Sequence, residues 1–302
     1  MRKNLVVILQ AFKDFFLGGQ AVIEGVVIRS KDKVAIAVRK RDGLIKVKSW
    51  QVKPYSEVSS IFGFPIVRGV VSLYDALVWG IKTLCYSADE VLDNDEKVSS
   101  WEMAGSIILA LGLAIGLFIV LPTFLSRIVE LRMGLDRLSL NLLEGILRVI
   151  IFVGYLIVIS FSKEIRSVFS YHGAEHKTIN AYETLRSDLT PDVVQRFSRF
   201  HYRCGTSFIL LVLVISIFSF ALFEQEGIVR RLIVRLSLIP LVAGVSYEVL
   251  KLSFSSRIVR FLAGPGLWLQ YLTTREPSRE QVEVGIAALK EALGNVGEIK
   301  EA

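Results

Sequence analysis

The three histidines of the chain lie close together in the sequence, with residues around them that also bind metals. His172 and His176 belong to the sequence Tyr-His-Gly-Ala-Glu-His-Lys, in which Glu175 precedes the second histidine. His201 begins the sequence His-Tyr-Arg-Cys, which ends at Cys204. Neutral imidazole, thiolate and carboxylate are the groups that hold transition metals in proteins. The cluster therefore indicates a metal site.

The first two histidines have the spacing of a metal-binding pair on a helix. Residues four apart share one helix face, so His172 and His176 can hold one ion. Their order with Glu175 is the reversed zincin order, in which paired histidines bind zinc and the glutamate activates a water molecule. Residues 163–186 contain no proline, and Gly173 is their only strong helix-weakening residue. We expect a helix there, a divalent metal, zinc, as cofactor, and Glu175 as the catalytic base.

A third ligand must come from elsewhere in the chain. The candidates are His201, Cys204 and Glu248. Cys204 could instead be a small buried residue without a ligand role. Glu248 could instead pair with Lys251. Three protein ligands leave one coordination position open for chemistry, whereas four close the site and make the metal structural. The sequence leaves both alternatives open.

The elements that position these residues are predicted to lie in a membrane. The chain is 52% hydrophobic with a mean hydropathy of +0.51, which is too apolar for an ordinary soluble domain. A helix needs about 20 apolar residues to cross a bilayer. The segments that meet this requirement are residues 104–125, 143–161, 207–223 and 232–250. We therefore expect a mainly α-helical membrane protein with four transmembrane helices.

The distribution of basic residues predicts the orientation of these spans. Residues 1–103, 162–206 and 251–302 share one side of the membrane and hold 15, 7 and 7 of the 36 lysines and arginines. The positive-inside rule then places both termini, and the histidine loop 162–206, in the cytoplasm. A multi-pass inner-membrane protein accounts for the net charge of +7, so direct binding of nucleic acid is not expected.

Residues 1–100 are expected to form a small cytoplasmic α+β unit. The predicted strands are residues 22–29, 34–39 and 44–52. They are separated by hairpin turn sequences, and the alternation in the second strand predicts one buried face of the sheet. Pro65 opens an amphipathic helix that extends to residue 92 and packs on the sheet or lies on the membrane surface.

The rest of the chain is divided into two predicted regions. Residues 101–256 are the transmembrane region, and residues 257–302 follow it. Within the latter, residues 257–272 alternate basic and apolar side chains and contain aromatic residues typical of the headgroup level, so we expect an interfacial or re-entrant segment. Residues 279–293 are expected to form a soluble amphipathic helix.

Four motifs resemble those of one bacterial family. They are Gly-Gly-Gln-Ala-Val-Ile-Glu-Gly-Val at residues 18–26, Tyr-His-Gly-Ala-Glu-His-Lys at 171–177, His-Tyr-Arg-Cys-Gly-Thr at 201–206 and Thr-Thr-Arg-Glu-Pro at 273–277. Over residues 18–293 the chain resembles the YqhQ-like membrane family, also called the domain of unknown function 1385 family. Tyr202 departs from the proline expected there. The resemblance implies a membrane protein described as a metal-dependent enzyme without a settled activity, and it draws attention to Gln20, Glu24 and residues 273–277.

Two functions fit these observations. The first is a metal-dependent hydrolase of a peptide, lipid or phosphoester bond, whose site lies beneath the membrane. The alternative is a scaffold or assembly factor whose structural metal fastens the loop 162–206 to the spans, and which binds a cytoplasmic protein partner with its basic face. The lipid bilayer is the expected surrounding in both, and the oligomeric state is left open. Transport fits less well, because four spans contain few buried charges.

Overall fold

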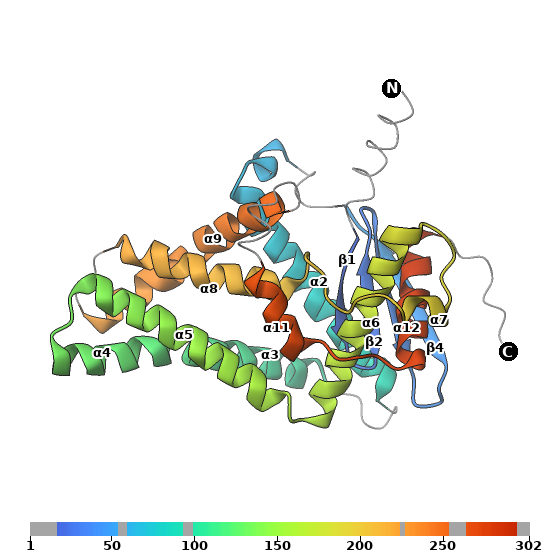
Figure 1. The fold of residues 1–302 in the computed structure, drawn as a ribbon, viewed down its shortest axis with the longest axis horizontal. Coiled ribbons are helices and arrows are strands. Elements are labelled where there is room, and N and C mark those ends of the chain that lie inside the picture. The colour runs from blue at the N-terminus through green and yellow to red at the C-terminus, as the bar shows by residue number, and fades with distance from the viewer. Residues whose placement is uncertain (1–16, 54–58, 93–98, 224–226, 254–263, 295–302) are drawn as a thin grey trace.

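The computed structural model describes residues 17–53, 59–92, 99–223, 227–253 and 264–294. The chain is mainly helical, with one small antiparallel sheet near its N-terminus. Figure 1 shows that the sheet and the helices around it lie at one end of the molecule, and that long helices extend from them toward the other end. The predicted combination of a helical body with a small N-terminal sheet is confirmed at this level.

The sheet has four strands in the order β1-β2-β3-β4, so each strand pairs with its neighbour in sequence. The strands are β1 (Gly18–Val22), β2 (Gly25–Arg29), β3 (Lys33–Arg39) and β4 (Ile45–Gln51). The strand predicted over residues 22–29 is interrupted by a turn at Ile23 and Glu24, and β1 before it was not predicted. Glu24 adopts a left-handed φ of 47°, which glutamate seldom does. The turn therefore has no signal in its residue types.

Helices cover both faces of this sheet, so the prediction of a single buried face is wrong. On one face Val26 lies opposite Ala37, and it packs with residues of α6 (Lys163–Leu185) and α12 (Arg279–Leu293). On the other face Val27 lies opposite Ile36, and it packs with aromatic residues of α2 (Val67–Val91). The C-terminal helix α12 and the histidine helix α6 thus complete the core of the N-terminal sheet. The helix expected after Pro65 packs on the sheet.

The long apolar helices form the second part of the molecule. In chain order they are α3 (Ser100–Ile115), the π-helical turn η4 (Gly116–Val120), α4 (Leu121–Met133), α5 (Arg137–Ile159), α8 (Gly205–Ala221) and α9 (Ile228–Ser253). Among the described residues, two helices are long and apolar enough to cross a membrane, namely Trp101–Met133 and Leu138–Ile159. The third predicted span is the shorter apolar helix α8, and the fourth is α9, which contains Pro240 and several charged residues.

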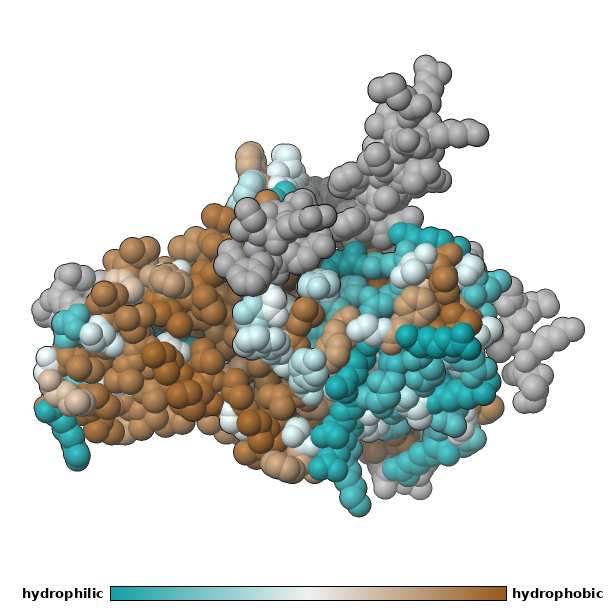
Figure 2. Space-filling view, viewed as in Figure 1, coloured by the Kyte–Doolittle hydropathy of each residue, from teal (hydrophilic) through white to brown (hydrophobic). Residues whose placement is uncertain are grey.

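The surface differs between the two parts of the molecule. Figure 2 shows hydrophobic residues over the long helices and hydrophilic residues over the end that contains the sheet, α6 and α12. Large apolar side chains such as Ile108 and Leu109 are 71% and 64% exposed. Exposed apolar area of this extent marks a surface that contacts another apolar medium or another protein.

The histidine helix begins anew after α5 and does not extend it. α5 ends at Ile159, and Ser162 caps the N-terminus of α6 by accepting a hydrogen bond from the Ile165 amide. The short elements η2 (Ser60–Gly63), α7 (Pro191–Val194) and α11 (Pro265–Thr273) complete the fold. The expected interfacial segment 257–272 lies partly outside the described residues, and the remainder of it belongs to α11.

Candidate metal centre

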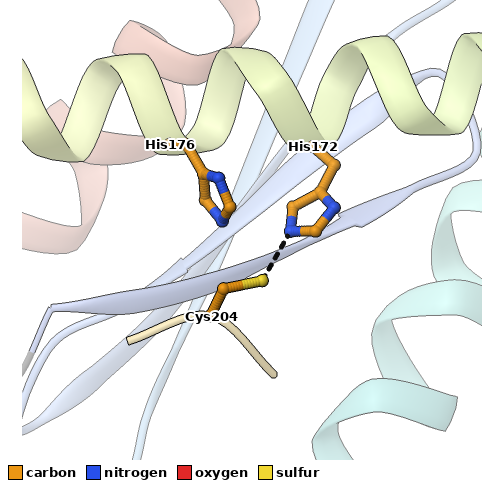
Figure 3. Close-up of side chains that lie close together, drawn as sticks. All are labelled: His172, His176 and Cys204. Carbon is orange, nitrogen blue, oxygen red and sulfur yellow. Dashed lines mark hydrogen bonds between the residues drawn. The ribbon is translucent and has the colours of Figure 1, made fainter. Parts of the chain in front are cut away.

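The centre is formed where the start of α8 meets the middle of α6. The rings of His172 and His176 are 4.3 Å apart between centroids, because residues four apart share one face of α6. Cys204 is the N-cap residue of α8 and points toward them (Figure 3). His172 Nε2 lies 3.2 Å from Cys204 Sγ, and the ligand atoms of all three residues lie within 4.8 Å of one another.

Both histidines are oriented by backbone carbonyls behind them. His172 Nδ1 lies 2.8 Å from the Thr273 carbonyl oxygen, and His176 Nδ1 lies 2.6 Å from the Arg199 carbonyl oxygen. A carbonyl only accepts hydrogen bonds, so each Nδ1 carries a hydrogen and each Nε2 faces the centre, where it can offer a lone pair to a metal. Metal-binding histidines in proteins are held in this way.

Burial favours the neutral form of His176, His201 and Cys204. Desolvation, and then the nearby His172, lower the pKa of His176 well below its usual value, and the same causes lower the pKa of His201 to about 4. Burial raises the pKa of the Cys204 thiol to about 12. Neutral imidazoles are ready to bind a metal, and a thiol loses its proton when it coordinates one. The donor set therefore fits a divalent transition metal.

Glu175 lies beside the gathered atoms. Its Oε2 is 3.5 Å from His176 Nε2 and 3.9 Å from His172 Nε2. Burial raises the pKa of Glu175 to about 7. β1 passes directly over this side chain, and a Cβ added to Gly19 would lie 2.8 Å from Glu175 Cγ. Of the glycines at residues 18 and 19, it is Gly19 that lets the β1 backbone lie directly against the Glu175 side chain.

The other two candidate ligands lie apart from the group of three. His201 Nε2 is 3.3 Å from Arg203 Nη2 and 3.7 Å from Glu183 Oε2, and the His201 ring centroid is 5.6 Å from that of His176. Glu248, on α9, accepts a hydrogen bond of 2.6 Å from Arg68 Nε of α2. The structure therefore brings together His172, His176 and Cys204, and it places Glu248 in an ion pair between two helices.

The segment 273–277 crosses α6 and supplies part of this support. A Cβ added to Gly173 would lie 2.0 Å from the Arg275 carbonyl oxygen, so only glycine allows the segment to pass. The Arg275 amide donates to the Phe169 carbonyl oxygen at 2.8 Å, and Arg199 Nη1 donates to the Thr274 carbonyl oxygen at 3.0 Å. The glycine inside a predicted helix, together with the motif at 273–277, was the available sign of this crossing.

Gln270 is a buried residue of the site that sequence reasoning missed. Its Oε1 accepts a hydrogen bond of 2.9 Å from the His201 amide, and its Nε2 donates one of 2.8 Å to the His201 carbonyl oxygen. The Gln270 side chain, on α11, therefore bonds both backbone groups of His201, as a neighbouring strand would. It fixes the backbone that leads to Cys204. A glutamine in an apolar helix does not reveal such a contact by its spacing.

The hairpin of β1 and β2 also contacts α6. Glu24 accepts hydrogen bonds from Ser167 Oγ at 2.7 Å and from the Tyr171 hydroxyl at 3.1 Å. Gln20 Nε2 donates to Thr83 Oγ1 of α2 at 2.8 Å. The motif at residues 18–26 therefore ties the sheet to α6 and α2, and it positions the helix that carries two of the candidate ligands.

Comparison with known proteins places the chain in a family. Residues 64–295 match the family described as "Protein of unknown function (DUF1385)". The chain belongs to this family. This DUF1385 chain is 36% identical over 293 residues to the uncharacterized protein YqhQ of Bacillus subtilis (strain 168), an alignment that covers 91% of this chain and 92% of that protein. No solved structure matches the chain. The DUF1385 match includes the three gathered residues and the segment 273–277, and it begins after the sheet.

Proposed function

We propose that this DUF1385 protein is an integral inner-membrane protein that binds a divalent metal, zinc, on its cytoplasmic side and uses it for hydrolysis. Two long apolar helices and the exposed apolar side chains along them support insertion into a bilayer. In this proposal α8 and α9 are the third and fourth spans, with both termini in the cytoplasm as the basic residues indicate.

The position of the site relative to these helices supports a membrane-proximal location. α5 ends at Ile159 shortly before the histidine helix, and α8 begins at Gly205, directly after Cys204. The ligands thus follow one proposed span and precede another. A substrate that is part of the membrane, or that emerges from it, would meet the site there.

One observation carries the proposed chemistry. Two carbonyl-held histidines and a cysteine present their ligand atoms to one point, and the Glu175 carboxylate lies 3.5 Å from the nearer imidazole nitrogen. Three protein ligands are the number found at catalytic zinc sites, which keep a fourth position for water or substrate. A glutamate beside such a site, not part of the ligand group, suits a general base.

The roles of the residues follow from this arrangement. A bound divalent metal would act as a Lewis acid and lower the pKa of a water molecule that attacks the substrate. His172, His176 and Cys204 would hold the metal. Glu175 takes the proton of the attacking water and passes it to the leaving group. A peptide, lipid or phosphoester bond is the proposed substrate class.

Burial of the site favours a second function, in which the metal is structural. His176 is 1% exposed and Glu175 is 3% exposed, so little of the centre faces solvent. A metal held by α6 and by the start of α8 would fasten the sheet part of the molecule to the long helices. The protein would then act as a scaffold for a cytoplasmic partner.

Metal analysis of purified protein tests the premise that both functions share. His176→Ala should remove the metal, and His201→Ala, which changes a nearby histidine outside the group of three, should retain it. If wild type and His176→Ala hold the same amount of metal, the site is not where we place it.

Hydrolysis of p-nitrophenyl phosphate and p-nitrophenyl acetate separates the two functions. Glu175→Gln should keep the metal and lose roughly 100-fold or more of the rate, because a general base contributes about that much. If Glu175→Gln hydrolyses both compounds as wild type does, Glu175 is not the base. If wild type hydrolyses neither, but loses thermal stability when the metal is chelated, the structural function is the correct one.

A further inference from the structure

The long helices enclose a second charged cluster, far from the metal centre. Glu144 and Arg148 of α5 are one helical turn apart, and Arg148 Nη2 lies 2.8 Å from Glu144 Oε1. Arg235 of α9 approaches the same carboxylate, with its Nη1 2.5 Å from Oε1. These three side chains are 3–5% exposed. One buried carboxylate therefore faces two buried guanidinium groups.

Neutral oxygen atoms satisfy the remaining hydrogen bonds of this cluster. Arg148 Nε donates to the Phe118 carbonyl oxygen in the π-helical turn at 2.9 Å, and Arg148 Nη1 donates to Ser216 Oγ at 2.9 Å. The hydroxyl groups of Thr123 and Ser126 donate to Glu144. These contacts satisfy polar atoms without adding negative charge, so the cluster keeps an excess positive charge.

A cavity of about 460 Å³ lies against this cluster. Its polar lining includes Arg127 and Glu130 of α4, and Arg231 and Arg235 of α9. Glu130 Oε2 lies 2.9 Å from Arg127 Nη1 and 3.6 Å from Arg231 Nη1, so one carboxylate is again shared by two arginines. Among the described residues of the cavity and the cluster, four arginines stand against two glutamates.

From this excess we propose that the cavity binds an anion with a phosphate group. Uncompensated charge is costly between apolar helices, and an anion in the cavity would balance it. The planar guanidinium group binds the oxygen pairs of phosphate well. Apart from Asn141, the other walls are formed mainly by apolar residues, which include Leu138, Phe220 and Phe223. The phosphate belongs either to an anionic lipid, whose chains would follow those walls, or to a free anion.

The cavity is distinct from the metal centre. α8 begins directly after Cys204 at the metal centre, and its last residue, Ala221, lines the cavity. A helix of 17 residues is about 25 Å long, so the two sites lie at opposite ends of α8. With the topology proposed above, the cavity faces the extracytoplasmic half of the membrane.

Calorimetric titration of the full chain in an uncharged detergent tests this site. The probes are inorganic phosphate and dihexanoyl phosphatidylglycerol. Arg231→Gln should weaken binding about tenfold or more, because Arg231 lines the cavity. Arg230→Gln removes the same charge from an exposed neighbour that does not line it and should bind as wild type does. Binding of phosphate identifies a free anion, and binding of the lipid alone identifies a headgroup.

The proposal is overturned if neither probe binds to the wild-type protein. It is also overturned if Arg230→Gln and Arg231→Gln weaken binding equally. Glu224 and Glu226 occur in the sequence between the lining residues Phe223 and Gly227. If phosphate binds only after both glutamates are changed to Gln, carboxylates of this chain already balance the positive charge of the cavity, and the proposal is wrong. Arg127→Gln is the second variant if Arg231→Gln does not fold, and the same weakening is expected from it.

Discussion

Replacing Gly173 by alanine tests whether the segment that crosses α6 holds the proposed metal centre in place. The added Cβ would lie 2.0 Å from the Arg275 carbonyl oxygen, whereas ordinary contacts begin near 3.4 Å. The segment must therefore move away from α6 by about 1.4 Å. The neighbouring Thr273 carbonyl, which orients His172, would move with it.

The expected effect follows from opposing contributions. Alanine favours the helix by about 1 kcal/mol over glycine. The displaced segment loses the hydrogen bond between Arg275 and Phe169 and the one between Thr273 and His172, each worth about 1 kcal/mol, and overpacking adds about 1–3 kcal/mol. We expect a net loss of about 2–4 kcal/mol in the free energy of unfolding. Loss of the carbonyl behind a ligand should also weaken metal binding roughly 10- to 100-fold.

Chemical unfolding in detergent and competition with a metal chelator measure the two effects. Gly154→Ala is the matched control, because Gly154 lies within α5 and a Cβ there would meet no atom within 4 Å. This control should be neutral or gain up to about 1 kcal/mol. If Gly173→Ala behaves as Gly154→Ala does in both assays, the crossing segment does not support the site and the reasoning is refuted.

Two further predictions concern contacts around the site and the sheet. Gln270→Leu should lower the free energy of unfolding by about 2–3 kcal/mol, because it leaves the buried amide and carbonyl of His201 unpaired; an unchanged unfolding midpoint would contradict this. Ser49, and then Lys33, lower the pKa of Glu291 against the opposing effect of burial. Its stabilising contribution, about 0.5 kcal/mol, is therefore present above pH 4.5 and lost as the pH falls. The melting-temperature difference between wild type and Glu291→Gln should shrink on acidification, and a constant difference would contradict the assignment.

Local signals were sufficient for the helices that carry and cover the site. Residues 279–293 were predicted as a helix, and α12 has those bounds because Ser278 forms a capping box and Gly294 ends the helix in a left-handed conformation. The absence of proline from residues 163–186 predicts a helix there, and α6 ends one residue earlier. Caps and apolar periodicity are properties of neighbouring residues, so the sequence shows them directly.

The turn between β1 and β2 depends on contacts that no local pattern contains. Glu24 adopts a left-handed conformation, and its carboxylate accepts hydrogen bonds from Ser167 and Tyr171 of α6, which is distant in the sequence. These contacts hold the turn in place. Burial of the second sheet face likewise depends on α12, from the other end of the chain. Neither contact could be derived from the residues around the strands.

The spacing of His172 and His176 predicted that they share a helix face, and the structure shows it. The choice among the remaining candidates required the tertiary structure. α2 and α9 cross closely at Gly69 and Gly244. A Cβ added to Gly69 would lie within 3 Å of α9, and a Cβ added to Gly244 would lie within 3 Å of the residue just before α2. That crossing brings Glu248 to Arg68. The sequence between α7 and α8 gave no comparable indication that Cys204 points into the group while His201 points toward Glu183.

X-ray absorption spectroscopy of the purified protein at the zinc edge tests the central claim most directly. The account predicts one sulfur atom at about 2.3 Å and at least two nitrogen atoms at about 2.0–2.1 Å from the metal. Cys204→Ser should remove the sulfur contribution, and Cys85→Ser, at the other cysteine, should leave it unchanged. A wild-type protein without bound metal, or one whose spectrum contains no sulfur ligand, would contradict the account.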